Sequence, residues 1–414
     1  MRDPLEAVDI DKKRAVTYVL LAIASGVVLA VARPNVFGTV AVIFGFFVMI
    51  MLHEFGHFVM AKRAGMKVTE FFVGFGPRVW SVQKGETEYG LKAIPAGGYC
   101  RIIGMTNLEE VEPEDEPRAY RSKGFLQKLG VACAGSAMHF LIALVLVFVV
   151  LACAGDWFSD SSTTTTVHDV AGPAAQALVH PGDHILSVAG QPVHTWDDAV
   201  KAIQDRPGET VALVVSRKAN GVPERVTLSV HLAAGRPDDP GDHVGYAGIT
   251  PDGSIVRPSV LQSVALAPWR EVQLGGTSIA ALGHIFSPSG VHGYLENFQK
   301  SPPKSAQQDR PVSVVGFGRL ASQAVAAGWV QTFLLLILIN VFIGIFNLVP
   351  LLPFDGGHAA IAIYEWIASA VRRRRVQVDV ARLMPVTLLV LAVLAFLFLS
   401  TLFLDVKNPI ANPF

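Results

Sequence analysis

The sequence predicts an α-helical integral membrane protein that carries a soluble α+β domain between its spans. The chain is 51% hydrophobic and only 16% charged, whereas soluble domains carry about 25% charged residues. Its mean hydropathy is also high, at +0.43. Apolar stretches long enough to cross about 30 Å of hydrocarbon cover residues 15–31, 39–60, 129–152, 330–349 and 385–404.

The first of these stretches has two interpretations. A basic cluster at 12–14 precedes it, as in a secretory signal peptide. However, the candidate cleavage site at 30–32 is followed directly by Arg33 and Pro34, which would be an unfavourable start for a mature chain. We therefore favour an uncleaved span.

The basic residues of the loops predict the orientation of the spans. Lys and Arg are frequent between 61 and 128, and four consecutive arginines occupy 372–375. Loops rich in Lys and Arg stay in the cytoplasm, so both segments are predicted to be cytoplasmic and region 155–331 to lie outside. The arginine run is more typical of a topology anchor than of a nucleic-acid patch. Because Lys+Arg and Asp+Glu number 34 each, no nucleic-acid partner is predicted.

The second stretch contains the motif His-Glu-Phe-Gly-His at 53–57. A charged group deep in a bilayer costs about 2.5–3.5 kcal/mol on insertion scales, so such residues usually have a function. On a helix, positions i and i+4 share a face, so His53 and His57 can hold one zinc ion. Glu54 beside them can act as a general base. The alternative is that these polar residues only pair between helices.

A zinc ion held by two imidazoles needs a further protein ligand and an open position. Residues 347–358 read Asn-Leu-Val-Pro-Leu-Leu-Pro-Phe-Asp-Gly-Gly-His. The prolines exclude a regular helix, and non-helical backbone at membrane depth is tolerated where it lines a cavity. At 1.5 Å per residue, this segment and His53 both lie within about 10 Å of the cytoplasmic face. Asp355 is therefore the predicted third ligand, and a carboxylate solvated at the membrane edge is the alternative.

The two motifs together resemble the site-2 protease family of intramembrane zinc metalloproteases, in particular its RseP-like bacterial branch. The resemblance runs from about residue 46 to the C-terminus. It implies one zinc ion (Zn2+) and a bacterial inner-membrane location, with the active site in the membrane near the cytoplasmic side. The residue roles it implies are zinc ligation by His53, His57 and Asp355, general-base catalysis by Glu54, and contact with the substrate strand by Asn347.

The third stretch departs from the family pattern at one position. Gly135 matches the family's G-P-x-x-N region, but His139 stands where the family often has Asn. A fourth metal ligand is one interpretation of His139. A hydrogen bond between helices is the interpretation we favour.

The loop between the second and third stretches is predicted to form β-hairpins. Between 66 and 105, β-forming residues alternate with glycines. Residues 95–99 resemble the P-x-G-G loop of the same protease branch, which implies a membrane-associated β element with an edge near the active site. Gly97 and Gly98 would then contact the substrate as it adds a strand to this edge. A purely structural cytoplasmic hairpin is the alternative.

The region outside the membrane resembles a bacterial PDZ domain. A Pro-Gly-Asp turn at 181–183 leads into a predicted strand, and 196–203 is predicted to be a helix. PDZ domains bind a peptide as an added strand, whereas a size filter that excludes bulky substrates is the competing role.

The predicted fold is thus a four-span metalloprotease core with one extra N-terminal span, a membrane-associated β-hairpin region and an extracytoplasmic PDZ domain. The predicted regions are 1–38 (cytoplasmic N-terminus and additional span), 39–154 (first half of the core), 155–250 (PDZ-like domain), 251–328 (linker and amphipathic membrane-surface helices) and 329–414 (second half of the core).

The resemblance implies peptide-bond hydrolysis within the bilayer. Expected substrates are single-span membrane proteins, such as anti-sigma factors or signal-peptide remnants, after a first cut outside the membrane by a site-1-type protease. Membrane lipids are expected partners. Two other functions are alternatives: a metal-ion transporter in which His53, His57 and Asp355 form a transit site, and a catalytically silent scaffold that binds partners through its PDZ-like domain. Transporters commonly show internal repeats, none of which is visible, and the presence of Glu54 argues against a silent scaffold.

Overall fold

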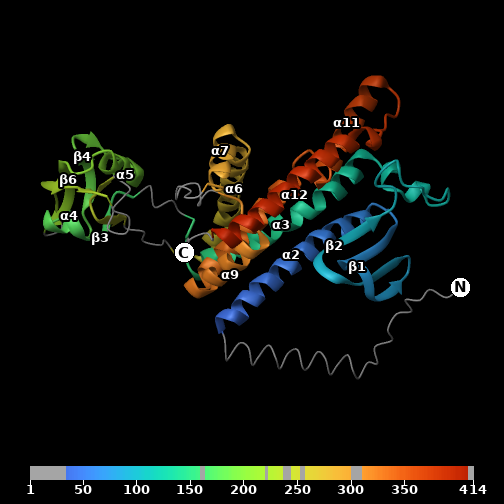
Figure 1. Cartoon of the computed structure of the whole chain (residues 1–414), viewed down its shortest axis with the longest axis horizontal. Helices are drawn as coiled ribbons and strands as arrows, with labels where there is room; N and C mark the ends of the chain where they lie inside the picture. The colour runs from blue at the N-terminus through green and yellow to red at the C-terminus, as the bar shows by residue number, and fades with distance from the viewer. Residues whose placement is uncertain are drawn as a thin grey trace. The chain divides into compact units, whose positions relative to one another are not determined.

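The computed structural model describes residues 34–158, 164–219, 222–235, 244–251, 257–299 and 310–408. The predicted span at 15–31 lies outside the described residues. The chain forms two compact units, one from Met1–Cys153 with Ser259–Phe414 and the other from Ala154–Pro258 (Figure 1).

Four helices within the described residues are long and apolar enough to cross a membrane. Three are α2 (Pro34–Arg63), α3 (Phe125–Cys153) and α10 (Trp329–Asn347). The fourth comprises the short 3-10 helix η4 (Val380–Leu383) and α12 (Met384–Lys407). They coincide with the last four predicted stretches, because long runs of apolar residues without internal breakers form continuous helices.

Helix α3 is the centre of the membrane unit. It packs against α2, α10, α6 (Val260–Ile285) and α11 (Asp355–Arg372). Its buried face includes Ala132, Ala134, Gly135 and Ser136, and such small residues let the backbones of neighbouring helices approach closely. The helix thereby holds together the two elements, α2 and α11, that carry the predicted metal ligands.

The remaining helices of this unit pack around the spans. Helix α9 (Val314–Ala327) contacts α2, α10 and α12, and the short α7 (Pro288–Glu296) contacts α6. A buried ion pair between Arg310 and Asp405 (2.8 Å) joins the chain before α9 to the end of α12. The backbone N–H of Ser313 donates to the same carboxylate (2.6 Å), so the last span is fastened at this end.

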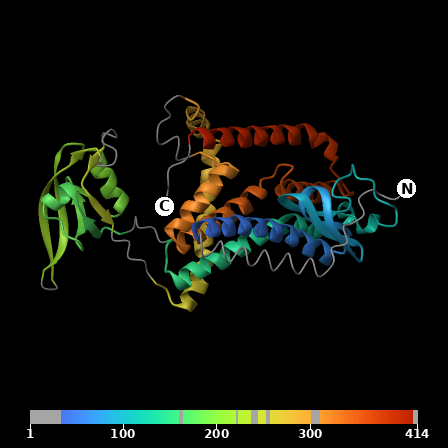
Figure 2. The same ribbon diagram turned by 60° about the horizontal axis from the view of Figure 1, so that its bottom comes forward.

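The predicted β-hairpin region forms two long antiparallel strands, β1 (Val68–Lys84) and β2 (Thr87–Ile102) (Figure 2). Both strands fold back, so the first half of β1 lies between the two halves of β2. Phe72, for example, pairs with Tyr99 on one side and Gly90 on the other. The last part of β2 is therefore an edge, and it lies against α2. A Cβ at Gly98 would lie 2.5 Å from Sδ of Met51 on α2 and 3.0 Å from the Phe72 backbone oxygen, so glycine favours this close approach.

The second unit is an α+β domain. Its sheet has the order β5-β4-β6-β7, and β10 pairs with β3. A buried core that includes Ile185, Val188, Trp196 and Leu213 lies between the sheet and the helices. The elements are β3 (Val167–Val170), α4 (Gly172–Gln176), β4 (His184–Val188), β5 (Gln191–Pro192), α5 (Trp196–Gln204), β6 (Thr210–Ala219), β7 (Val222–His231), β8 (Ala233–Ala234), β9 (Gly245–Tyr246) and β10 (Ile249–Pro251).

We expect an ion pair to make the stability of this unit depend on acid pH. The Asp183 carboxylate, 1% exposed, accepts two hydrogen bonds from Arg217 (2.8 and 2.7 Å) and one from the His180 N–H (2.9 Å). Burial alone would raise the pKa of Asp183, but Arg217 and His180 outweigh it and the pKa lies below its ordinary value. The folded-state pKa is thus below the unfolded one, so the stabilisation is present above about pH 4 and is lost as pH falls through the folded-state pKa.

Arg217→Ala leaves this carboxylate buried without a counter-charge, which should lower the free energy of unfolding by about 3–5 kcal/mol at neutral pH. The measurement is hydrogen exchange of the amides of this unit in the intact protein. Arg225→Ala, at an exposed position on β7, is the matched control. The expectation is wrong if the two variants lose equal stability. It is also wrong if the difference in free energy of unfolding between wild type and Arg217→Ala stays the same as the pH is lowered.

Candidate metal centre

Helix α2 places the two predicted imidazoles on one face. His53 and His57 are four residues apart, and each is 8% exposed. Their ring centroids lie 4.8 Å apart, as expected for positions i and i+4 of a regular helix.

The third predicted ligand is positioned by the break between α10 and α11. Helix α10 ends at Asn347, and α11 begins at Asp355. The connecting loop folds tightly against the start of α11: a Cβ at Gly356 would lie 2.2 Å from the Leu348 carbonyl oxygen, and one at Gly357 would lie 2.6 Å from the Leu352 backbone nitrogen. The two glycines therefore allow the compact turn that brings Asp355 into the membrane unit.

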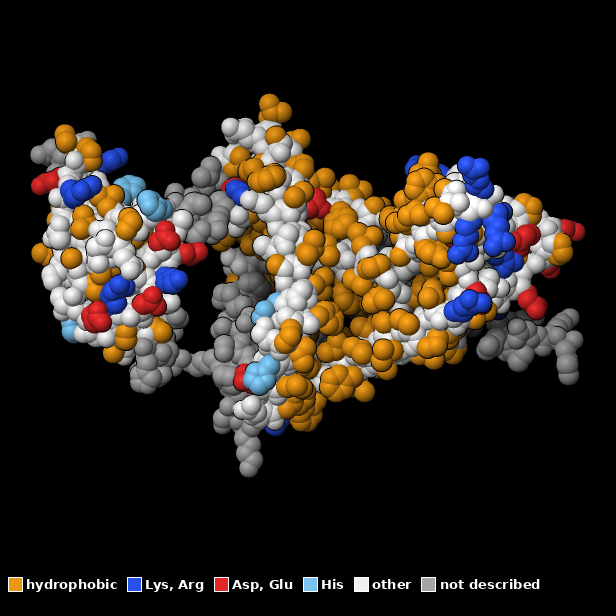
Figure 3. Space-filling model, turned by 90° about the horizontal axis from the view of Figure 1, so that it is seen from above, with side chains coloured by type: hydrophobic (Ala, Val, Ile, Leu, Met, Phe, Trp, Pro, Cys, Tyr) orange, Lys and Arg blue, Asp and Glu red, His pale blue; other side chains and the backbone are white. Residues whose placement is uncertain are grey.

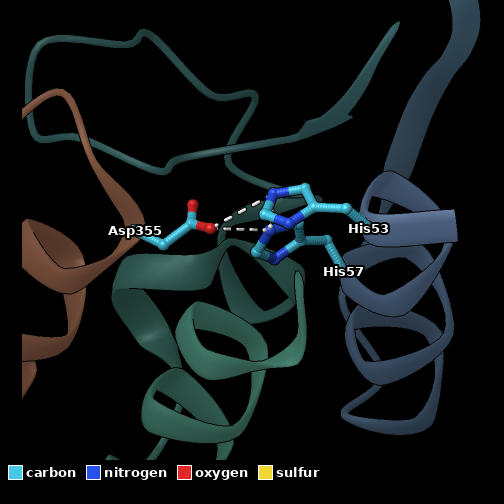
Figure 4. Close-up of side chains that lie close together, drawn as sticks. All are labelled: His53, His57 and Asp355. Atoms are coloured by element: carbon cyan, nitrogen blue, oxygen red, sulfur yellow. Dashed lines mark hydrogen bonds and ion pairs between the residues drawn. The ribbon is translucent and has the colours of Figure 1, made fainter. Parts of the chain in front are cut away.

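The three side chains converge on one point (Figure 4). Nε2 of His57 lies 3.2 Å from Nε2 of His53, and Oδ2 of Asp355 lies 3.3 Å from His53 Nε2 and 3.2 Å from His57 Nε2. Ligand atoms bound about 2.0–2.1 Å from a tetrahedral zinc lie about 3.3 Å apart. The three separations therefore match three edges of a zinc tetrahedron.

The hydrogen bond behind His57 shows why a cation fits between these groups. Nδ1 of His57 lies 2.7 Å from the Val131 carbonyl oxygen on α3. A carbonyl only accepts, so Nδ1 donates and the Nε2 of a neutral ring carries a lone pair. Nε2 lies 3.2 Å from Oδ2 of Asp355, so a neutral ring meets this carboxylate acceptor to acceptor unless a proton or a cation lies between them. A metal ion resolves this repulsion, and the backbone bond fixes the ring as a ligand.

Helix α3 also forms the floor of the site. A Cβ at Gly135 would lie 2.3 Å from Cε1 of His53 and 2.4 Å from Nε2 of His57. Only glycine leaves room for both imidazoles at this position. Gly135 matches a family motif, but this contact was not predicted from the sequence. The available signal was a glycine inside a long apolar helix.

The predicted hydrogen bond of His139 between helices is present. Nδ1 of His139 lies 2.9 Å from Oδ1 of Asn340 on α10, and both side chains are buried. The His139 ring centroid is 5.1 Å from that of His53. Asn340 was not singled out from the sequence, because one polar residue in an apolar stretch does not reveal which helix it faces.

Glu54 lies beside the three ligand atoms without belonging to their cluster. Among the described residues, His53, His57 and Asp355 form the group whose ligand atoms lie within 4.8 Å of one another. The Glu54 carboxylate interacts electrostatically with all three and lies close to the Cys100 backbone on β2. This arrangement suits a group that moves protons rather than one that binds metal.

The predicted substrate contacts lie in β2 and at the end of α10. Gly97 and Gly98 are buried in β2 against α2. Asn347 is half-buried at the end of α10, and within the described residues no hydrogen bond to the three ligands is recorded for it. Their role in binding substrate stays a prediction.

Comparison with known proteins places this arrangement in a family. Residues 41–391 match the model of peptidase family M50. The chain belongs to peptidase family M50, the site-2 proteases. It is 33% identical over 394 residues to the zinc metalloprotease Rip1 of Mycolicibacterium smegmatis, covering 88% of this chain and 96% of that protein. It is 32% identical over 399 residues to Rip1 of Mycobacterium tuberculosis, covering 88% and 95%.

A more distant relative is a putative zinc metalloprotease of Clostridium acetobutylicum, 27% identical over 335 residues and covering 80% of this chain and 88% of that protein. Membership of family M50, together with four helices able to span a membrane, makes the chain a multi-pass membrane protein and a zinc metalloprotease. The predicted family, enzyme class and metal are thus confirmed.

Proposed function

We propose that this M50 protein cleaves the transmembrane segments of single-span membrane proteins after a first cut outside the membrane, as in regulated intramembrane proteolysis. The observation that carries the proposal is the tetrahedral spacing of His53, His57 and Asp355, which join two elements of a membrane-spanning helical unit. Anti-sigma factors and signal-peptide remnants are the substrate classes we favour, with a site-1-type protease acting upstream.

The chemistry we propose divides between the ligands and Glu54. His53, His57 and Asp355 would hold zinc. When bound, zinc would act as a Lewis acid that lowers the pKa of a water molecule and polarises the scissile carbonyl. Glu54 accepts the proton of the attacking water and returns it to the leaving amine.

The substrate would reach this centre as an extended strand. The edge formed by the last part of β2 lies against α2, and its Cys100 backbone is close to Glu54. A strand paired with this edge would present its backbone carbonyls next to the metal centre, near Gly97, Gly98 and Asn347. The substrate helix must unwind first, because its own backbone hydrogen bonds otherwise occupy these carbonyls.

We further propose an orientation in the bacterial inner membrane. The basic 61–128 loop and the arginines at 372–375 would face the cytoplasm, and the metal centre would lie near that side. The second unit would then lie outside, where a PDZ-like domain either binds the trimmed end of the substrate or excludes substrates with bulky exteriors.

Metal removal tests the proposed reaction. We expect a membrane-permeant zinc chelator to stop cleavage of a model single-span substrate by the full-length protein in nanodiscs, and added zinc to restore it. The reason is that the attacking water needs the Lewis acid. Cleavage that continues after zinc has been removed to undetectable levels by elemental analysis would contradict the proposal. A transporter would instead take up zinc into sealed vesicles and leave the substrate intact.

A further inference from the structure

Helix α11 ends in a concentrated positive charge that the proposed reaction does not use. Four consecutive arginines at 372–375, here called the arginine tip, are all exposed. Arg373 adopts the left-handed conformation (φ 50°) that ends the helix. Figure 3 shows the corresponding cluster of Lys and Arg side chains at one end of the membrane unit, beside apolar surface.

Three of the four positive charges of the arginine tip have no counter-charge in the described part of the unit, whereas Arg375 interacts electrostatically with Glu116. Within the described residues, no ion pair is recorded for any of the arginines at 372–374, and Arg375 donates to the backbone oxygen of Arg121 (2.9 Å). The nearby carboxylates have other partners. Glu365 binds Lys128 (2.8 Å) and the Val378 N–H (2.9 Å), and Glu116 binds Arg121 (2.6 Å). Arg372, Arg373 and Arg374 are therefore free to bind an external anion.

The same helix exposes apolar side chains below the arginine tip. Tyr364, Trp366, Ile367 and Val371 are at least half exposed, Val371 to 78%. Helix α11 is not one of the four spanning helices, and it packs on α3. Aromatic and aliphatic residues followed by arginines are typical of helices at the membrane–water interface. A soluble acidic partner would not explain the apolar face, whereas a lipid has both an acyl chain and a charged head.

We propose that the arginine tip binds the phosphate headgroups of anionic phospholipids, with the apolar side chains of α11 against the acyl region. Guanidinium groups match phosphate oxygens in geometry and charge. The inference rests on the membrane placement in the proposed function and not on its catalytic step.

Lipid selectivity of the full-length protein tests this inference without any measurement of proteolysis. Spin-labelled phosphatidylglycerol and phosphatidylcholine are compared for association with the protein in phosphatidylcholine bilayers. We expect wild type to prefer phosphatidylglycerol by at least about fivefold, the effect of one basic residue at an anionic surface. The triple variant Arg372→Gln, Arg373→Gln, Arg374→Gln should reduce this preference severalfold, and the corresponding Lys triple should retain most of it.

The matched control removes three positive charges from exposed positions of the second unit, with Lys201→Gln, Lys218→Gln and Arg225→Gln. It should keep the preference of wild type, and all variants should keep zinc. Equal association of both lipids with wild type overturns the inference, as does an unchanged preference in the arginine-to-glutamine triple. An equal loss in the control triple also overturns it, because the effect would then be one of net charge.

Discussion

Glu54→Gln should abolish proteolysis while zinc stays bound. Glutamine has the shape of glutamate but cannot accept a proton at neutral pH, and the three proposed ligands are untouched. Removal of a general acid–base group typically lowers the rate by about 10²–10⁴, so we expect a decrease in kcat of that size. Zinc content should remain equal to that of wild type, because Glu54 lies outside the cluster of ligand atoms.

The experiment is a cleavage assay with a model single-span substrate, run beside elemental analysis of the same preparations. Glu110→Gln, at an exposed position, makes the same chemical change away from the site and should leave kcat unchanged. Glu54→Asp keeps the carboxylate on a side chain that is one methylene shorter, so the carboxylate lies farther from the metal centre. We expect this variant to have intermediate activity. If Glu54→Gln cleaves at the wild-type rate, Glu54 is not the base. If it loses zinc, its role is structural.

Gly135→Ala should destroy the site by a different route. The added methyl would lie 2.3 Å from Cε1 of His53 and 2.4 Å from Nε2 of His57, so at least one imidazole must leave its position. Changes in the groups that orient metal ligands commonly cost 10–100-fold in affinity. This change displaces the ligands themselves, and we expect zinc affinity to fall by at least about 100-fold, with cleavage lost in proportion.

A control on the same helix separates this effect from a general change in α3. At Gly130, a Cβ would meet only the terminal methyl of Met60, at 3.1 Å, and that flexible side chain can move away. Alanine also favours the helix by about 1 kcal/mol relative to glycine. Gly130→Ala should therefore bind zinc normally. Zinc affinity is measured by competition with a chromophoric chelator, and thermal unfolding shows whether the fold persists. Normal zinc binding by Gly135→Ala would mean that the imidazoles do not rest on α3.

The two variants give different signatures. Glu54→Gln keeps the metal and loses the reaction, whereas Gly135→Ala loses both. If the histidines served only to pair helices, the protein would show neither pattern. Zinc content would then be the same in wild type and in both variants.

Much of the candidate site follows from local features of the sequence. The i, i+4 spacing of His53 and His57 needs only a helix, and the length of the apolar run ensures one. The proline and glycine content of 347–358 predicts a broken segment. The bilayer adds a common axis, so residues far apart in sequence can be assigned similar depths by counting 1.5 Å per residue. Depth and family resemblance together predicted that Asp355 joins the two histidines.

The sequence alone thus determined which stretches are long and apolar enough to cross a membrane and which family the chain resembles, and it predicted that the three metal ligands lie at a similar depth. The depth of a residue does not tell how its helix is rotated about its own axis or which helices pack beside it in the plane of the membrane. Only the tertiary structure decided that α3 supplies the Val131 carbonyl and the Gly135 floor, that His139 bonds Asn340, and that the edge of β2 lies against α2. These contacts depend on which face each helix turns to its neighbours. In uniformly apolar helices no hydrophobic stripe marks that face, so close packing of small residues selects it.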